Sequence, residues 1–351
     1  MGKTLFLGHA DTGMRGGPAI FTSIYKAWSG DKYMIFEKSY TTMIKRLLTY
    51  VLKNKVDKII MENEYFSDVL IALLIKIFNR KIMIYGPAYH IPPKPALHKE
   101  FIKQFLHYAD YKLGIWFMAV SYNAIYTENS YMKHYLESIN SKANIIVESP
   151  GIDNKYLKPL SYILNLNKDI DFLFLTSFTY NKGMYDFLNL VAGLSNKYNN
   201  IKFAMGGFAT EQTLSEIRSF MKSNNIENIE IHPDLTEQEK YNLYSRAKVY
   251  ILPSMEDGIP ITFYEAWGYG NIVVSYLLDT YIDVKDLIVP VELRNQKQLL
   301  DSCIEIYENY DKFKRIYAEK CYDYSLKHSY EAGINNIVNR LSRNSRIETV
   351  S

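Results

Sequence analysis

Two carboxylates stand out because they lie where an α/β sheet binds its ligands. The sequence predicts a strand over residues 249–252, a helix over about 261–269 and a second strand over 272–274. Asp257 falls on the loop before that helix and Glu265 falls inside it, with seven residues between them. Ligands of open α/β sheets bind beyond the carboxyl ends of the strands. We therefore expect these two side chains to take part in ligand binding.

The residues at either end of this helix favour the predicted limits. Pro260 suits the first helical turn because it has no N–H to lose there, and it stands directly before the apolar run. Gly270 suits the end of the helix, where a left-handed backbone conformation is wanted. The helix is therefore expected to begin just after the loop that carries Asp257.

A second region suited to ligand binding lies near the start of the chain. A predicted strand, Thr4 to Leu7, is followed by Gly16 and Gly17 and then by a helical run to about Trp28. Backbone N–H groups exposed at a Gly-rich helix start, together with the helix dipole, favour phosphate. A plain tight turn is an equal alternative. The spacing is not G-x-G-x-x-G, so a nicotinamide cofactor gains no support.

Carboxylates and an imidazole follow two further strands of the first half. Glu62 and Glu64 come after a strand ending at residue 61, and His90 and Lys94 lie on the proline-rich loop after a strand ending at residue 85. An imidazole at this edge can act as a base or hold a phosphate. For each residue the alternative, a solvated loop side chain or a histidine bonded to backbone, stays open.

Apolar segments alternate with helical patterns along both halves of the chain. This alternation predicts parallel sheets with helices on both faces, and the length favours two domains. A turn at 149–153 marks the expected boundary, and the chain beyond 293 reads as helical to about 340. The predicted strands are 4–7, 33–36, 58–61, 81–85, 125–127, 145–147, 171–176, 201–205, 229–232, 249–252 and 272–274.

Composition excludes several other classes of protein. The net charge is +3, but residues 1–150 carry 19 Lys and Arg against 12 Asp and Glu, which hints at an anionic ligand or membrane surface. Cys303 and Cys321 lack metal spacing and form no disulfide framework. The D-x-D of Asp169 and Asp171 precedes a strand, at the wrong end of the sheet for a ligand. We expect no metal site, no nucleic-acid partner and no signal peptide or membrane-spanning segment.

The run 95–108 permits two interpretations. It predicts an amphipathic helix with lysines and histidines beside apolar residues. An ordinary packed surface helix is favoured. A helix that lies on an anionic membrane surface is the alternative.

The residues from 253 to 274 resemble the signature P-S-x-x-E-G-x-P…E-A-x-x-x-G-x-P-V-V of retaining GT-B glycosyltransferases of family 4, the glycosyl transferases group 1. They spell PSMEDGIP and then EAWGYGNIVV, and Gly258 and Pro260 set the register. Asp257 then takes the first acidic position of the family's E-x7-E motif, in place of the usual glutamate, and Glu265 takes the second.

Other segments resemble the family in the same order along the chain. Gly16 and Gly17 match its N-terminal glycine pair, and residues 149–153 resemble its linker, usually P-N-G-V-D. Residues 176–183 match the segment G-R-x-x-x-x-K-G, with Ser177 at the arginine position. Gly206 and Gly207 match the glycines after the next strand. The resemblance thus covers nearly the whole chain.

The resemblance implies a fold and a domain division. The fold is GT-B: two Rossmann-like α/β domains that face each other across a cleft, with C-terminal helices that pack back toward the N-terminal domain. The implied parts are an acceptor-binding domain at 1–152, a domain at 153–325 that binds the nucleotide sugar, and a C-terminal helix and polar tail at 326–351.

The resemblance also implies a reaction. A sugar passes from a nucleoside-diphosphate sugar to an acceptor with retention of configuration, without a metal, and the donor is a co-substrate rather than a cofactor. Lys182 would neutralise the departing diphosphate, Asp257 would meet the sugar hydroxyls, and Glu265 would accept hydrogen bonds from the ribose. The implied catalytic residues are Asp257, Lys182 and His90. The implied donor site consists of Gly16, Gly17, Ser177, Lys182, Gly207, Pro253, Asp257, Gly258, Ile259, Pro260, Ile261 and Glu265. The acceptor-side residues are Glu62, Glu64, His90 and Lys94.

The acceptor stays open at this point. Lysines at 94, 99 and 103 beside apolar residues suit a lipid-linked or cell-surface glycan and peripheral contact with an anionic membrane. The expected location is the cytoplasm, with the inner membrane face as the place of that contact. The alternatives are a transferase acting on a soluble small molecule or a protein, a nucleotide-sugar epimerase or phosphorylase on the same fold, and a non-catalytic subunit.

Overall fold

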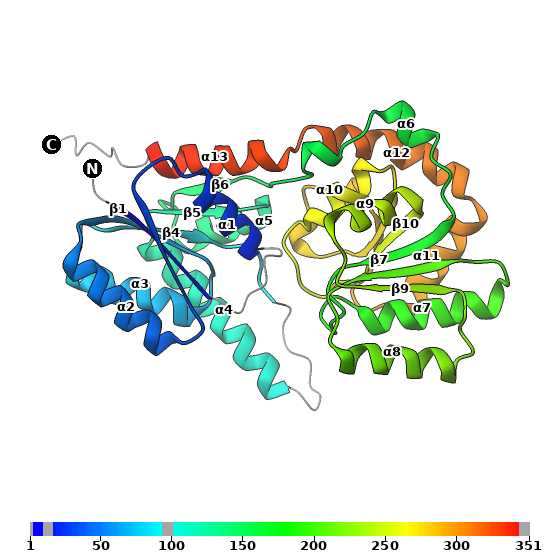
Figure 1. Ribbon diagram of the computed structural model, residues 1–351, viewed down its shortest axis with the longest axis horizontal. Helices are drawn as coiled ribbons and strands as arrows, with labels where there is room; N and C mark the ends of the chain where they lie inside the picture. Colours follow the sequence, from blue (N-terminus) through cyan, green and yellow to red (C-terminus); the bar gives the residue numbers. More distant parts are fainter. Residues whose placement is uncertain (1–2, 10–16, 93–100, 344–351) are drawn as a thin grey trace. The chain divides into compact units, whose positions relative to one another are not determined.

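The computed structural model describes residues 3–9, 17–92 and 101–343. Its chain divides into two compact units, which Figure 1 shows in the colours of the sequence. Unit 1 consists of residues 1–150 and 330–351, and unit 2 consists of residues 151–329. Each unit is built on its own sheet and is described by itself.

Unit 1 is built on a six-stranded sheet in the order β2-β1-β3-β4-β5-β6, with every neighbouring pair parallel. Its interior strands are almost entirely buried, as near-continuous apolar runs in parallel sheets are. The strands are β1 (Lys3–His9), β2 (Lys32–Glu37), β3 (Val56–Met61), β4 (Met83–Pro87), β5 (Ala124–Thr127) and β6 (Ile145–Val147).

The helices of unit 1 cover both faces of this sheet. The chain moves one way along the sheet from β1 to β2 and the other way through all later strands, so right-handed crossovers place α1 on one face and the next four helices on the other. The last helix, α13, packs beside α1. The helices are α1 (Gly17–Ala27), α2 (Tyr40–Lys53), α3 (Phe66–Phe78), α4 (Phe101–Ser121), α5 (Ser130–Ile139) and α13 (Tyr330–Arg343).

Unit 2 is built on a second six-stranded parallel sheet, in the order β12-β11-β10-β7-β8-β9. Side chains of β7 alternate between two apolar cores: Phe172 and Phe174 belong to one, and Leu173 and Leu175 to the other. The strands are β7 (Ile170–Leu175), β8 (Phe203–Gly207), β9 (Ile229–Pro233), β10 (Ala247–Leu252), β11 (Ile272–Tyr276) and β12 (Val289–Val291).

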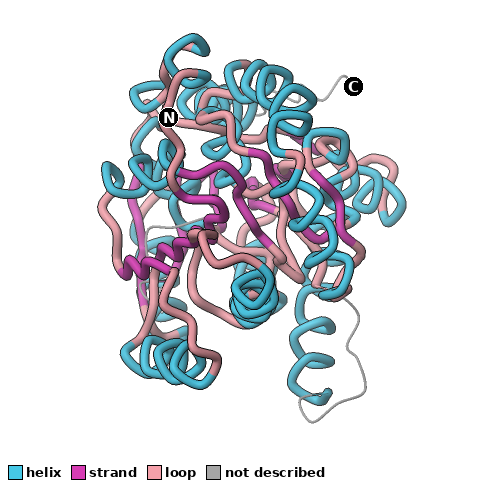
Figure 2. The backbone as a smooth tube through the Cα atoms, turned by 90° about the vertical axis from the view of Figure 1, so that its right-hand side faces the viewer, coloured by secondary structure: helices cyan, strands magenta, loops and turns pink. Residues whose placement is uncertain are grey.

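Helices enclose the sheet of unit 2, so that its strands run through the interior, as Figure 2 shows from the side of this unit. The α-helices are α6 (Leu160–Leu164), α7 (Met184–Lys197), α8 (Glu211–Ser223), α9 (Glu237–Arg246), α10 (Ile261–Gly268), α11 (Gln296–Glu308) and α12 (Tyr310–Leu326). Short 3-10 helices lie at η1 (Asn154–Tyr156), η2 (Asp279–Tyr281) and η3 (Lys285–Leu287).

The predicted α/β fold class and its parallel sheets are confirmed. Every predicted strand is present, and its observed ends lie within about two residues of the predicted ones. The short strand β12 was not predicted, because its two valines alternate with Pro290 and Glu292 and form no apolar run. The helix predicted over 95–108 is described only from Phe101, and it continues to Ser121. Among the described residues, none of the helices combines the length and the apolar character needed to cross a bilayer.

Candidate functional site

Two loops at the carboxyl edge of the second sheet are locked together. The loop after β7 reaches Gly183, whose φ of +78° is left-handed and whose Cβ, if it had one, would lie 2.1 Å from the Pro253 carbonyl oxygen. The Met255 amide donates to the Asn181 carbonyl over 2.8 Å. The hydroxyl of the fully buried Ser254 lies 3.3 Å from the same carbonyl and 3.0 Å from the Glu256 carbonyl, and its one hydrogen can donate to either. The loops after β7 and β10 therefore form one rigid platform.

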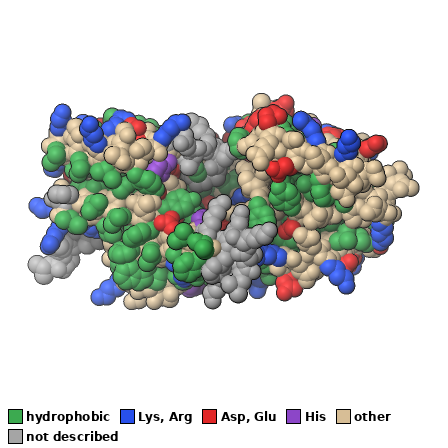
Figure 3. Space-filling view, turned by 90° about the horizontal axis from the view of Figure 1, so that it is seen from below, with side chains coloured by type: hydrophobic (Ala, Val, Ile, Leu, Met, Phe, Trp, Pro, Cys, Tyr) green, Lys and Arg blue, Asp and Glu red, His purple; other side chains and the backbone are tan. Residues whose placement is uncertain are grey.

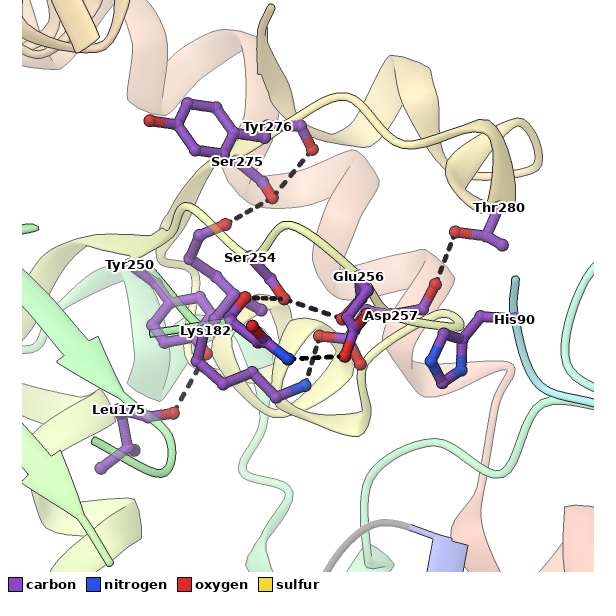
Figure 4. A network of polar contacts seen from close by, with 12 residues as sticks. His90, Leu175, Lys182, Tyr250, Ser254, Glu256, Asp257, Ser275, Tyr276 and Thr280 are labelled. Atoms are coloured by element: carbon purple, nitrogen blue, oxygen red, sulfur yellow. Dashed lines mark hydrogen bonds and ion pairs between the residues drawn. The ribbon is translucent and has the colours of Figure 1, made fainter. Parts of the chain in front are cut away.

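An ion pair joins the two loops on this platform. The Nζ atom of Lys182 lies 2.6 Å from Oδ2 of Asp257, and the two side chains are 29% and 17% exposed. Thr280 fixes the other end of the aspartate residue, because its hydroxyl donates to the Asp257 carbonyl over 2.7 Å. Figure 4 shows Lys182 and Asp257 pointing toward each other, with Ser254 and Thr280 nearby. The pair is partly open to solvent and can be reached by a ligand.

The pair retains hydrogen-bonding capacity for a ligand. An ammonium group has three donors and a carboxylate about four acceptor positions, and their mutual bond takes one of each. Within the described residues, the buried amides of Gly258 and Ile259 donate to no protein group. They stand just before α10, whose N-cap is Pro260, and Ile261 is its first residue. A cation, free amides and a helix start suit an anion, while the carboxylate suits hydroxyl groups.

Glu265 lies inside α10 and has a different set of partners. Glu265 is buried, with only 4% of its surface exposed to solvent. Oε1 accepts hydrogen bonds from Lys240 at 2.7 Å and Tyr241 at 3.0 Å, and Oε2 accepts one from Tyr244 at 3.1 Å. All three partners lie on α9, so this carboxylate joins α9 to α10. Three of its acceptor positions are used, and a ribose contact would have to use the remaining one or displace a partner.

Contacts with Glu265 shift the pKa values of the α9 side chains that surround it. Burial acts to lower the pKa of Lys240, but the charge and hydrogen bond of Glu265 outweigh burial, and the pKa is raised. Burial, reinforced by the negative charge of Glu265, also raises the pKa of Tyr244 far above its ordinary value. The group therefore consists of a fixed ion pair with two neutral phenols that donate to the carboxylate.

The remaining predicted donor-site residues lie on the neighbouring strand ends of unit 2. Ser177 follows β7 on the partly exposed loop that leads to Lys182. Gly207 ends β8 with a φ of +140°, and a Cβ there would lie 1.9 Å from the Thr176 carbonyl oxygen. Pro253, the first residue of the loop after β10, is buried. A glycine is thus required at position 207, because the backbone at the end of β8 passes so close to the backbone of Thr176.

In unit 1, the carboxyl edge of the sheet holds buried carboxylates. The backbone N–H of His9, at the end of β1, donates to Oε2 of Glu62 over 2.6 Å. The Nε2 atom of the His9 ring lies 2.9 Å from Oδ1 of Asp68. The hydrogen bond to Asp68 raises the pKa of His9, and burial only partly opposes it. His9 and Asp68 did not stand out in the sequence because they are 59 residues apart.

Glu64 and His90 lie near each other at the same edge. The Glu64 Oε1 atom lies 3.9 Å from Nδ1 of His90 and accepts a hydrogen bond from the Tyr89 amide at 3.4 Å. Glu64 is 3% exposed, and burial raises the pKa of its carboxyl to about 8. Burial therefore favours the protonated form of the Glu64 carboxyl. Gly17 is the first residue of α1, whereas Gly16 and Lys94 lie outside the described residues.

The structure thus brings Lys182 and Asp257 into direct contact and surrounds Glu265 with side chains of α9. Sequence analysis missed Thr280 and the α9 residues, because their bonds to the site join positions that no short motif connects. In the described ranges no group of three or more His, Cys, Asp or Glu residues is arranged to hold a metal ion.

Comparisons with known proteins concern the second unit first. Residues 162–319 match the family model described as "Glycosyl transferases group 1", and this segment lies within unit 2. The match includes Lys182, Asp257 and Glu265. None of the curated proteins matches the chain in sequence.

Solved structures establish the fold of the whole chain. The Anabaena protein HepE, solved with UDP and glucose, is 12% identical with a TM-score of 0.71, and the alignment covers 97% of this chain and 100% of that one. The sucrose-phosphate synthase of Thermosynechococcus elongatus is also 12% identical, with a TM-score of 0.75 and coverage of 98% and 99%. TarM from S. aureus is 15% identical with a TM-score of 0.59, over 80% of this chain and 54% of that one. The chain has the two-unit GT-B fold that these structures share.

Proposed function

We propose that this chain is a glycosyltransferase that moves a sugar from a nucleoside-diphosphate sugar to an acceptor. The observation that carries the proposal is the contact of Lys182 with Asp257 on the platform of unit 2. That contact lies inside the segment that matches the glycosyl transferases group 1. Its cation suits a diphosphate and its carboxylate suits sugar hydroxyls, so one site accommodates both parts of such a donor.

The donor-side roles follow from the hydrogen-bonding capacity that the platform retains. When the sugar–phosphate bond breaks, negative charge grows on the departing diphosphate, and Lys182 with the amides before α10 stabilises that charge. Because a lysine and backbone amides supply the positive potential, the proposed reaction needs no metal. One carboxylate oxygen of Asp257 holds Lys182, and the other accepts hydrogen bonds from hydroxyl groups of the sugar. Glu265 contacts the ribose only through its one remaining acceptor position.

The finer parts of the proposal concern stereochemistry and acceptor. We infer retention of configuration from the resemblance of the E-x7-E region, with Asp257 at its first acidic position. A glycan or lipid-linked acceptor is proposed, with Glu62, Glu64, His90 and Lys94 as acceptor-side groups of unit 1. Burial raises the pKa of Glu64 and so favours its protonated form, and a protonated carboxyl can donate a hydrogen bond to an uncharged hydroxyl acceptor.

The proposal is tested by incubating the purified chain with a panel of nucleoside-diphosphate sugars and candidate acceptors, and by analysing the products by NMR. Sugar transfer with the donor's anomeric configuration kept in the product supports it. Inverted product would overturn retention alone. An isomerised nucleotide sugar without acceptor would identify an epimerase, and the absence of turnover and of donor hydrolysis with every donor would identify a non-catalytic subunit.

A further inference from the structure

The helices on one side of the first sheet carry an unusual outer surface. Helices α2, α3 and α4 lie on the same side of the sheet (Figure 1), and α3 packs against α4. More than half of the exposed large apolar side chains among the described residues lie on these three helices. Leu52, Ile77 and Ile102 are the most exposed of them, at 86%, 71% and 73%. Figure 3 shows apolar side chains gathered over this side of unit 1.

The spacing shows that this surface is a second apolar face and not a poorly covered core. On α3, Val69, Ala72 and Ile75 are buried, whereas Leu74 and Ile77 point to solvent. Surface helices ordinarily carry polar residues opposite their buried face. On α4, Leu113, Trp116 and Val120 likewise form an exposed stripe at helical spacing, opposite the buried Ile115 and Met118. Two adjacent helices are therefore apolar on both sides.

The fully exposed charges along these segments are all cationic. Six cationic side chains are exposed along residues 40–92 and 101–121, and in those described residues no carboxylate is exposed. Glu62, Glu64 and Asp68 are buried, and Asp57 and Asp110 are partly buried. One of the cations, Arg46, forms an ion pair with Glu37 of β2. The exposed cations are Lys45, Arg46, Lys53, Lys55, Arg80 and Lys81.

We propose that the outer face of α2, α3 and α4 lies on the surface of an anionic lipid bilayer. An apolar face enters the boundary between headgroups and acyl chains, and surrounding lysines and arginines are attracted to anionic headgroups. Charge complementarity selects this occupant over a second copy of the chain. A twofold dimer through this face would place the same basic rim against itself. The inference does not depend on the sugar-transfer activity.

The test is co-sedimentation of the full chain with large vesicles, one set of phosphatidylcholine alone and one set containing 40% phosphatidylglycerol. The apolar variant is Leu74→Glu/Ile77→Glu/Trp116→Glu. Its matched control places the same charges on exposed apolar positions of unit 2, Ile282→Glu/Ile316→Glu/Leu326→Glu. The charge variant is Lys45→Gln/Lys53→Gln/Lys81→Gln, and its control is Lys222→Gln/Lys285→Gln/Lys297→Gln. Circular dichroism melting checks that each variant is folded.

The proposal predicts that the unaltered chain binds the anionic vesicles, and that added salt weakens this binding. Each removed lysine should lower the partition coefficient about fivefold, so the charge variant should bind at least tenfold more weakly, and the apolar variant should lose binding. Both controls should bind like the unaltered chain. If the unaltered chain does not bind anionic vesicles, or if the controls lose as much as the variants, the proposal is wrong. It is also wrong if this face instead mediates a dimer, seen by light scattering, that the apolar variant abolishes.

Discussion

The Nζ atom of Lys182 lies 2.6 Å from the Oδ2 atom of Asp257, although the two residues are 75 positions apart in the sequence. The bond joins the loop after β7 to the loop after β10, two strands that are neighbours in the sheet. Because the carboxylate holds the lysine in position in advance, the remaining donors of Lys182 can meet a diphosphate without a large loss of side-chain entropy.

The first prediction concerns the lysine of this pair. Lys182→Ala should lower the rate of sugar transfer by about 10²–10³-fold, because one charged donor to the leaving diphosphate is lost. The matched control is Lys197→Ala, which removes a lysine from the exposed ion pair with Glu308 and should change the rate by less than about twofold. Initial rates with a labelled nucleotide sugar provide the measurement. Equal rates for the two variants would contradict the assignment.

The second prediction separates stability from donor binding at Glu265. The resemblance assigns Glu265 to the ribose of the donor, but this carboxylate is also buried and bonded to three side chains of α9. Glu265→Gln should lower the free energy of unfolding by about 2–4 kcal/mol, because Lys240 loses its buried partner.

The control for this second prediction removes the exposed partner of the same lysine. Glu237 lies 2.9 Å from Lys240 and is 62% exposed, so Glu237→Gln should cost less than about 0.5 kcal/mol. Guanidinium unfolding compares the two variants. A similar loss in both would show that Glu265 does not hold α9 to α10.

The third prediction concerns the left-handed glycine between the two loops. Gly183→Ala should destabilise unit 2 by more than about 2 kcal/mol and weaken donor binding, because the new Cβ would meet the Pro253 carbonyl at 2.1 Å. Gly270→Ala is the matched control: its φ is +64°, but its Cβ would approach only a side-chain methyl of Ile163, at 3.0 Å. This variant should cost about 1 kcal/mol. If Gly183→Ala bound donor normally, the rigid platform would be unnecessary.

The fourth prediction concerns the pH dependence of stability in unit 1. Burial raises the pKa of Glu64 from 4.5 to about 8. Between these values the unfolded chain has released this proton while the folded chain still binds it, so the free energy of unfolding falls as pH rises. Glu64→Gln has no proton to release, and its stability relative to the unaltered chain should rise between pH 4.5 and 8 and then level off.

Denaturant unfolding at pH 5, 6.5 and 8 measures that difference. Glu137→Gln is the control, since its carboxylate is 40% exposed beside Lys133 and removing an exposed ion pair should change stability only slightly. A constant difference between Glu64→Gln and the unaltered chain across the range would show that Glu64 is ionised in the folded protein at neutral pH.

The fold could be predicted from the sequence because its signals are local. Short apolar runs alternating with amphipathic helices indicate parallel sheets, and Pro260 and Gly270 limited α10 to within a residue or two of its observed ends. The site could be predicted only in part. Asp257 and Glu265 stood out through their motif, but the partners of Glu265 lie on α9, and the 10 residues of that helix carry no motif that points to them.

Burial also separated residues that looked alike in the sequence. Asp257 and Glu265 are both acids of one motif, yet the first is 17% exposed in its side chain and the second is 6% exposed. Which of the two is open to a ligand depends on how α9 packs against α10, and that packing is decided by contacts between distant segments. The same holds for His9 and Asp68, which meet only because β1 lies beside β3.

We propose above all that Lys182 and Asp257 together hold the diphosphate sugar, and calorimetric titration of a nucleoside diphosphate and its sugar conjugate tests this most directly. Lys182→Ala should weaken binding of both ligands at least tenfold, whereas Asp257→Asn should weaken the sugar conjugate more than the plain diphosphate. Unchanged affinity of Lys182→Ala for both ligands would contradict the proposal.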